Sequence, residues 1–287
     1  MSDLQSGEAD REMEPESPIV AALCDPKRPP LPYCAAIVVA HPDDETIGCG
    51  AQLSRFSDAT IVHLTDGAPR NGVDARRLGF AGPEDYAAAR RGELDAAMGL
   101  AGLAPDHLIA LGWADQEASA NIAVIATELV RVLAGMDVVL THAFEGGHPD
   151  HDATALAVHA ACALLRREGS APAMIEMPLY RAGPKGMVAQ TFALKEGSEE
   201  CVVHLDWEQQ QLKLAMYAAH ASQHDVLLLF TVDTESFRLA PRYDFSQPPN
   251  GGDILYERQP WGMTGARWQE FARAALAELG LEPLPWA

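Results

Sequence analysis

The sequence Ala40-His41-Pro42-Asp43-Asp44-Glu45 places a histidine and three acidic side chains at a turn between two elements. The apolar run at residues 35–39 precedes this turn and has the composition of a buried strand. Residues 46–53 follow it with the pattern of a helix start. Polar side chains between a strand and a helix lie at the carboxyl edge of a sheet, where α/β proteins bind ligands. The stretch therefore predicts both an α/β fold and a candidate site.

Strand and helix patterns alternate on both sides of this turn. Short apolar runs predict strands at residues 60–64, 108–111, 138–140 and 175–179, and the segments between them have helical patterns. Such alternation predicts right-handed βαβ units, and hence a Rossmann-like, mostly parallel sheet flanked by helices. After residue 180 the pattern becomes less regular, with a strand at 202–205, helices at 207–219 and 266–279, and an irregular region at 226–260. We expect this smaller C-terminal portion to complete the pocket.

Length and composition indicate one main domain. Residues 1–30 are rich in Asp, Glu, Ser and Pro, which predicts a disordered or loosely packed acidic arm. No linker divides residues 31–287, so we expect them to form a single domain of the 287-residue chain.

Charge and cysteine content restrict the class of partner and the compartment. The net charge of −20 repels phosphate backbones and anionic lipid, which argues against a nucleic-acid or membrane-surface partner. We expect neither a signal peptide nor a stable membrane insertion, because no sufficiently long apolar run occurs. The five cysteines are odd in number and form no CxxC pair, which predicts reduced thiols and a cytoplasmic protein.

A second histidine cluster, His148-Pro149-Asp150-His151, lies far along the chain. Pro149 suits the first position of a helix, and two imidazoles three residues apart then share one face. The preceding glycines at 146 and 147 let the backbone approach a site closely. Asp150 could orient one of the imidazoles.

Together the two clusters predict a metal site. His41, Asp44 and His151 would form a set of two histidines and one carboxylate, which suits catalytic Zn²⁺ and equally suits Fe²⁺. Asp43 would then accept a proton from water as general base. His148 would stabilise an oxyanion or protonate a leaving amine.

Two simpler readings compete with the metal site. The three acids of the first cluster could only cap a helix, because acidic residues complement its dipole. The run Gly48-Cys49-Gly50 after a first strand could also indicate a nucleotide site. However, Leu53 replaces the third glycine of that fingerprint, and close packing of helix on sheet explains the glycines better.

The two clusters resemble the motifs of the PIG-L/LmbE-like zinc-dependent N-acetylglucosamine deacetylases. Weaker similarities cover residues 65–67, 90–94, 115–116 and 213–223, so the resemblance spans roughly residues 35–223. It implies the metal and base roles given above, and it makes Asp150 the partner of His148. It also implies that Arg90 and Asp115 hold sugar hydroxyls. Arg90 could instead form a surface ion pair, and Asp115 could cap the following helix.

The resemblance implies a metal-dependent hydrolase that removes the N-acetyl group from an N-acetylglucosamine-containing small molecule or glycan precursor. A related amidase that cleaves another N-acyl group, on a thiol conjugate or an antibiotic, would share this site. A catalytically silent sugar-binding protein is the third hypothesis, although such a protein has no need of a base. Residues 68–82 and 226–260 match no member, so the aglycone stays open. The oligomeric state stays open as well.

Overall fold

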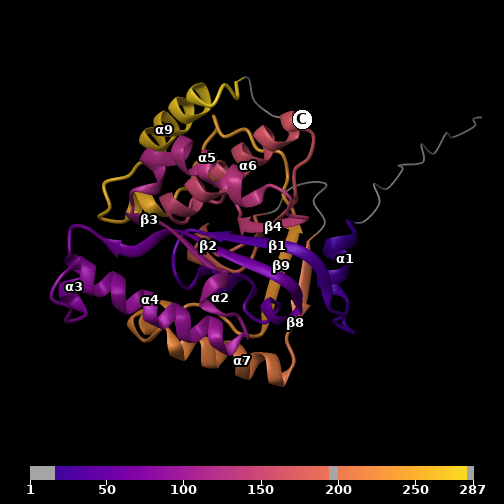
Figure 1. The fold of residues 1–287 in the computed structure, drawn as a ribbon. Helices are drawn as coiled ribbons and strands as arrows, with labels where there is room; N and C mark the ends of the chain where they lie inside the picture. The colour runs from indigo at the N-terminus through magenta and orange to yellow at the C-terminus, as the bar shows by residue number, and fades with distance from the viewer. Residues whose placement is uncertain (1–16, 194–199, 283–287) are drawn as a thin grey trace, which may run out of the picture.

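A seven-stranded sheet forms the centre of the computed structural model, which describes residues 17–193 and 200–282 (Figure 1). The strands lie in the order β3 (Leu108–Asp115), β2 (Phe56–Pro69), β1 (Leu31–Val39), β4 (Val138–His142), β5 (Ala173–Met177), β9 (Thr234–Leu239) and β8 (Cys201–His204). The first five run parallel, whereas β9 pairs antiparallel with both β5 and β8. The predicted mostly parallel α/β sheet is confirmed.

Helices cover both faces of the sheet (Figure 1). One face carries α5 (Ile122–Leu133), α6 (Pro149–Glu168) and α9 (Gly265–Glu278), and the other carries α2 (Asp44–Cys49), α4 (Pro83–Leu100) and α7 (Trp207–Ala219). In α5 the spacing of Ile122, Ile125, Leu129 and Leu133 puts one apolar stripe onto the sheet, and all four side chains are buried. No helix in the described ranges is long and apolar enough to cross a lipid bilayer.

The strand order reverses next to β1, and this reversal positions the site. β1 pairs with β2 on one side and with β4 on the other, so that Val38 lies between Val62 and Thr141. The chain crosses from one half of the sheet to the other between β3 and β4. At such a reversal the flanking loops diverge and leave a crevice at the carboxyl ends of the strands. Both histidine clusters follow strands that end there, β1 and β4.

Several segments are more ordered than the sequence predicted. β2 continues to Pro69, and α3 (Val73–Arg77) lies within the expected loop at 68–82. A hairpin of β6 (Tyr180–Gly183) and β7 (Gly186–Ala189) follows β5. The prediction that 226–260 is irregular is wrong for β9. That strand buries the charged side chains Glu235 and Arg238, which pair with Lys213 and Glu176, and these charges hide its strand pattern.

The N-terminal segment also differs from the prediction. Residues 1–16 of the expected acidic arm lie outside the described residues. From residue 17 onward the arm is not loose, because α1 (Pro18–Cys24) packs on the core through the fully buried Leu23. Arg55 fixes this helix by donating hydrogen bonds to the carbonyls of Leu23 (3.0 Å) and Ala22 (2.7 Å).

The structure joins Cys24 of α1 to Cys201 of β8 in a disulfide. The prediction that all five cysteines are reduced is therefore wrong for this pair, whose members lie 177 residues apart in the sequence and meet only in the fold. Cys34, Cys49 and Cys162 are free thiols. The cysteine content consequently no longer supports a reducing compartment.

Candidate metal centre and active site

Three side chains from the two histidine clusters converge at the carboxyl ends of β1 and β4. His41 Nδ1 lies 3.2 Å from Asp44 Oδ2, and His151 Nε2 lies 3.2 Å from His41 Nδ1 and 3.4 Å from Asp44 Oδ1. A tetrahedral ion with ligand bonds of about 2.0–2.1 Å separates its ligand atoms by about 3.3 Å. The spacing of these three donors fits one metal ion, and all three residues are buried.

Neighbouring side chains offer other groupings, and hydrogen bonds occupy one ring nitrogen in each of two neighbouring histidines. Three groups of side chains lie close enough to share an ion: His41 with His148 and His151, His41 with Asp115, His148 and Asp150, and Asp44 with His142 and His151. His142 Nε2 accepts the backbone N–H of Ala40 at 2.9 Å, which occupies its lone pair. His148 Nδ1 accepts the N–H of Asp150 at 3.2 Å, so in the neutral ring Nε2 carries the proton. We propose His41, Asp44 and His151 as the donor set, because two histidines and one carboxylate suit Zn²⁺ or Fe²⁺.

Electrostatics in the cluster also favour a cation. Burial alone would raise the pKa of Asp44, but His151, His142 and His41 hold it well below its usual range. Burial alone would lower the pKa of His41, but Asp115 and Asp44 raise it well above its usual value. The carboxylates therefore draw positive charge to this point, and a metal ion at Nδ1 would take the place of that proton.

Asp43 lies beside this triad in a strained backbone conformation. Its φ of 136° is rare for a residue with a side chain. The Glu45 carboxylate accepts the Asp43 N–H at 3.2 Å and also binds His63 Nε2 at 2.8 Å, so that buried partners support the strain. Burial raises the pKa of Asp43 to about 8, although Arg90 opposes the shift. A carboxyl group tuned toward neutral pH suits proton transfer.

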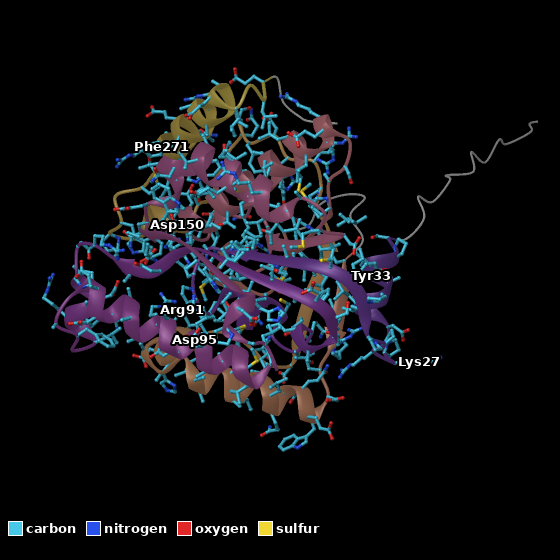
Figure 2. The ribbon with its side chains drawn as sticks, viewed as in Figure 1. Lys27, Tyr33, Arg91, Asp95, Asp150 and Phe271 are labelled. Atoms are coloured by element: carbon cyan, nitrogen blue, oxygen red, sulfur yellow. A yellow bond between two sulfur atoms is a disulfide. The ribbon has the colours of Figure 1, made fainter. Side chains whose placement is uncertain are left out.

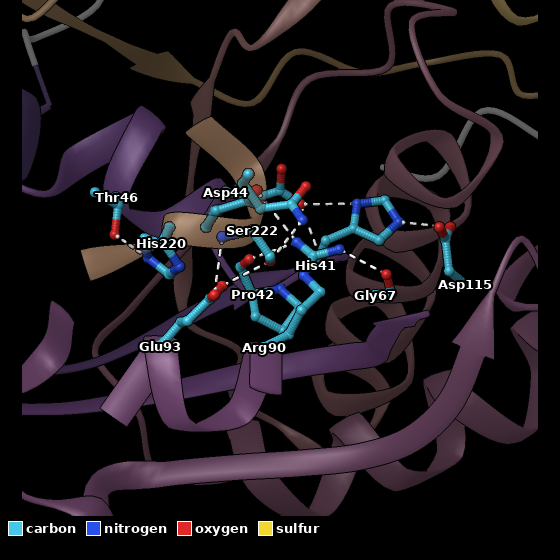
Figure 3. Close-up of polar contacts among 12 residues, drawn as sticks. His41, Pro42, Asp44, Thr46, Gly67, Arg90, Glu93, Asp115, His220 and Ser222 are labelled. Carbon is cyan, nitrogen blue, oxygen red and sulfur yellow. Dashed lines mark hydrogen bonds and ion pairs between the residues drawn. The ribbon is translucent and has the colours of Figure 1, made fainter. Parts of the chain in front are cut away.

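Arg90 holds Asp43 and the two turns around it. Its guanidinium donates to the carbonyls of Gly67 (2.7 Å) and Pro42 (2.6 Å) and lies 3.1 Å from Asp43 Oδ2 (Figure 3). Gly67 has a φ of +68°, and a Cβ there would lie 2.1 Å from an Arg90 nitrogen, so only glycine fits. Only 5% of Arg90 is exposed. This arrangement does not favour the expected role of Arg90 in holding sugar hydroxyls.

Two carboxylates face the outer nitrogen of His41. Asp115 Oδ1 lies 3.1 Å and Asp150 Oδ2 3.5 Å from His41 Nε2, and Figure 3 shows the ring between Asp44 and Asp115. The Asp150 carboxylate also accepts the backbone N–H groups of Gln116 (2.6 Å) and Ala118 (3.2 Å). It therefore faces His41, and it also lies within 4.8 Å of a His148 ring nitrogen, although no hydrogen bond or ion pair between the two side chains is formed.

His148 faces Asp115 instead, with Nε2 at 3.6 Å from Oδ1. Burial and the nearby His41 hold the pKa of His148 well below its usual value, so the ring is neutral. A neutral ring with its proton on Nε2 is a hydrogen-bond donor directed into the site.

Two aromatic residues that the sequence interpretation did not single out border the site. The Tyr180 ring lies 5.2 Å from that of His151, and the Trp261 ring lies 4.6 Å from that of His148. Tyr180 follows β5 at the same sheet edge, which is a signal that the sequence offered. Trp261 has no such signal, because it reaches the site only through the folding of the C-terminal segment.

The chain is similar to a known protein family and to a curated relative. Residues 36–162 match the model of the family described as PIG-L, GlcNAc-PI de-N-acetylase. Over 150 residues the chain is 33% identical to 1D-myo-inositol 2-acetamido-2-deoxy-alpha-D-glucopyranoside deacetylase 2 of Catenulispora acidiphila. This match covers 42% of the chain and 48% of the relative, so the chain spans about half of that protein's length.

Two solved structures share the fold. The A40926 pseudoaglycone deacetylase Dbv21 has a TM-score of 0.56 at 21% identity, covering 74% of this chain and 98% of its own. A deacetylase from the teicoplanin biosynthesis pathway, solved with teicoplanin, has a TM-score of 0.54 at 17% identity, covering 73% and 99%. Residues 36–162 of this chain thus match the PIG-L family model, and the two solved structures share the fold of the chain.

Proposed function

We propose that this protein is a metal-dependent hydrolase that removes the N-acetyl group from an N-acetylglucosamine-containing small molecule. The observation that supports this most directly is the spacing of His41 Nδ1, the Asp44 carboxylate and His151 Nε2, with Asp43 beside them. A binding protein needs no buried carboxyl group with a pKa near 8 at its metal site. The remaining features then correspond to the steps of amide hydrolysis.

His41, Asp44 and His151 would hold Zn²⁺ or Fe²⁺. The bound ion would supply a water of lowered pKa and would polarise the amide carbonyl. Asp43 accepts the proton of the attacking water, and the new C–O bond converts the carbonyl into a tetrahedral oxyanion. His148 donates its Nε2 proton in a hydrogen bond to that oxygen. Asp43 then returns the proton to nitrogen as the C–N bond breaks, which releases acetate and the free amine.

The substrate class rests on the relatives. The protein of Catenulispora acidiphila is named as a deacetylase of a 2-acetamido-sugar linked to inositol, and the family model carries the name of a GlcNAc-phosphatidylinositol de-N-acetylase. Both names specify an acetamido sugar. We therefore assign a small sugar amide as substrate, with Asp115 as the candidate contact to its hydroxyls because that side chain is partly exposed at the site.

Acetate release from GlcNAc-inositol and from free N-acetylglucosamine tests the proposal. Protein treated with chelator and dialysed should lose turnover, and addition of one equivalent of Zn²⁺ or Fe²⁺ should restore it. A panel that varies the acyl group and the sugar separately would distinguish an amidase of different specificity. Turnover that persists in chelator-treated protein of verified low metal content would contradict the mechanism.

A further inference from the structure

His63 of β2 lies behind the turn that carries Asp43. Strand β2 runs parallel to β1 and places His63 opposite Val39, two residues before His41. The His63 side chain is buried, and its Nε2 lies 2.8 Å from Glu45 Oε2. Its other ring nitrogen has no hydrogen-bond partner among the described residues. Within that part of the chain, Glu45 is therefore the polar group through which this ring can act on the site.

Glu45 transmits the contact to the main chain of the candidate base. Its side chain is fully buried, and the same Oε2 accepts the N–H of Asp43 at 3.2 Å. Its Oε1 accepts the Thr46 hydroxyl at 2.7 Å. Because both oxygens accept hydrogen bonds, the His63 nitrogen that faces Oε2 is a donor. Oε2 is thus fixed between a side chain of β2 and the Asp43 N–H.

The conformation of Asp43 depends on such support. Its φ of 136° and ψ of −24° lie outside the regions that residues with a side chain favour. A residue stays in such a conformation only where its surroundings hold it there. Arg90 contacts the Asp43 carboxylate at 3.1 Å, whereas Glu45 and His63 act on its main chain. A relaxed φ would move the carboxylate away from the metal ligands beside it.

We infer that His63 is a positioning residue, which acts through Glu45 to hold the Asp43 main chain in the conformation that directs the base to the attacking water. This inference rests on the proposed function. The ligand Asp44 is held separately, because its Oδ2 accepts the N–H of His41 at 2.8 Å. Loss of the His63 contact should therefore impair the base and leave the metal ligands in place.

Two amide variants of His63 provide the test. The amide nitrogen of His63→Gln is an ε atom, like the Nε2 that donates to Glu45, whereas that of His63→Asn is a δ atom and falls short of it. His63→Asn should lower kcat about 10²-fold, because a misplacement of about 1 Å has an effect of that size. KM and zinc affinity should stay within about twofold of wild type, and His63→Gln should keep kcat within about threefold.

His107→Asn is the matched control, because His107 also bonds to β2 but far from the site. Its Nδ1 donates to the carbonyl of Ala59 at 2.9 Å, near the amino end of the strand. This variant should leave kcat, KM and zinc affinity unchanged. A loss of kcat in His63→Asn that His63→Gln does not restore, or that an equal loss of zinc affinity accompanies, would overturn the inference.

Amide hydrogen exchange tests the positioning without substrate. NMR on zinc-loaded protein follows the Asp43 N–H, which Glu45 protects in wild type. Its exchange should become at least about tenfold faster in His63→Asn and stay near the wild-type rate in His63→Gln and His107→Asn. Unchanged exchange in His63→Asn would overturn the inference. If that variant does not fold, an unprotected Asp43 N–H in wild type would overturn it. Absence of acetate release by wild type, with the expected exchange rates, would instead contradict the proposed function.

Discussion

At the scale of single residues, Asp43 combines a strained backbone with a buried carboxyl group whose pKa is about 8. Asp43→Asn keeps the shape of the side chain and removes its ability to accept a proton. Because general-base catalysis contributes about 10²–10⁴-fold, kcat should fall by about 10³ while zinc affinity stays unchanged. Acetate-release kinetics and a zinc competition assay measure the two quantities. More than a tenth of wild-type kcat in Asp43→Asn would contradict the role of base.

Asp95→Asn is the control for this variant. Asp95 lies on α4, and its Oδ1 forms an ion pair with Arg91 Nε at 3.0 Å (Figure 2). More than a third of each side chain is exposed. An exposed pair of this kind contributes about 0–1 kcal/mol, so the substitution should change neither kcat nor zinc affinity.

Asp115 is the residue whose expected role and observed contacts differ most. Asp115 could mainly hold the proton on His41 Nε2, which keeps Nδ1 free for the metal. In that case Asp115→Asn should weaken zinc binding about 10–100-fold. If it mainly binds sugar hydroxyls, the same variant should raise KM and leave zinc affinity intact. The 3.1 Å contact with His41 favours the first outcome. Unchanged zinc affinity together with a raised KM would show that the contact with His41 is incidental.

The convergence of His41, Asp44 and His151 could be predicted from sequence because each cluster is local. His41 and Asp44 span a single turn after β1, and His151 lies in the first turn of α6, so strand ends and helix spacing bring them together. Arg90 could not be assigned in this way. Its three partners lie on segments 23 to 48 residues away in sequence, and only the packed fold shows that they use its donors.

At the scale of elements, the short helix α2 carries both Asp44 and Glu45 and depends on a buried ion pair. Lys213 of α7 is fully buried, and its Nζ donates to the Ile47 carbonyl and to Glu235, both at 2.8 Å. Glu235 also accepts the backbone N–H of Ala51 at 2.9 Å. Strand β9 and helix α7 thereby hold the last turn of α2 from behind.

Lys213→Met should destabilise the protein by about 3–5 kcal/mol, because it leaves the Glu235 carboxylate buried without its cation. Urea unfolding followed by circular dichroism measures the change. Lys185→Met, at an exposed position between β6 and β7, should stay within about 0.5 kcal/mol of wild type. A loss below 1 kcal/mol in Lys213→Met would mean that the pair does not anchor α2.

At the scale of the whole molecule, the C-terminal segment folds back over the second histidine cluster. The N–H of Leu255 donates to the Gly146 carbonyl at 2.8 Å, and Trp268 Nε1 donates to the Pro149 carbonyl at 3.1 Å. The sequence predicted that this portion completes the pocket. It could not predict the contacts, because they join residues more than 100 positions apart and follow no local period.

The parallel half of the sheet, in contrast, could be predicted because its sequence pattern is local. Strands β1, β4 and β5 are buried along most of their length and contain apolar runs, and helices separate successive strands, so composition and period indicate them directly. The antiparallel edge is different, because β9 contributes charged side chains to the interior and is recognisable only once Lys213 and Glu176 are known to face it. Sequence reasoning therefore succeeds where burial alone determines an element.

The pH dependence of the free energy of unfolding tests whether Glu145, which lies close to the second histidine cluster in sequence, is uncharged in the folded protein. Glu145 is 3% exposed; its Oε1 accepts the N–H groups of Leu179 and Tyr180, and its Oε2 has no partner among the described residues. Burial raises its pKa to about 8, with Asp152 adding to the shift, whereas the unfolded value is about 4.3. The folded state therefore retains a proton that the unfolded state loses between about pH 4.3 and 8. Stability from this group is greatest below that window and declines as pH rises through it, by at most about 1.4 kcal/mol per pH unit.

Glu145→Gln keeps an acceptor for both N–H groups and removes the ionisation. Relative to wild type, Glu145→Gln should therefore gain stability as pH rises: the difference in the free energy of unfolding, variant minus wild type, should increase at each step from pH 5.5 to 6.5 to 7.5. Taking the difference between the two proteins at each pH cancels the titration of the metal ligands, which they share. Glu278→Gln, at an exposed position on α9, should give a difference that does not change with pH. A constant difference for Glu145→Gln as well would mean that Glu145 is ionised in the folded protein, so that the loop beside Tyr180 would be held by a buried charge.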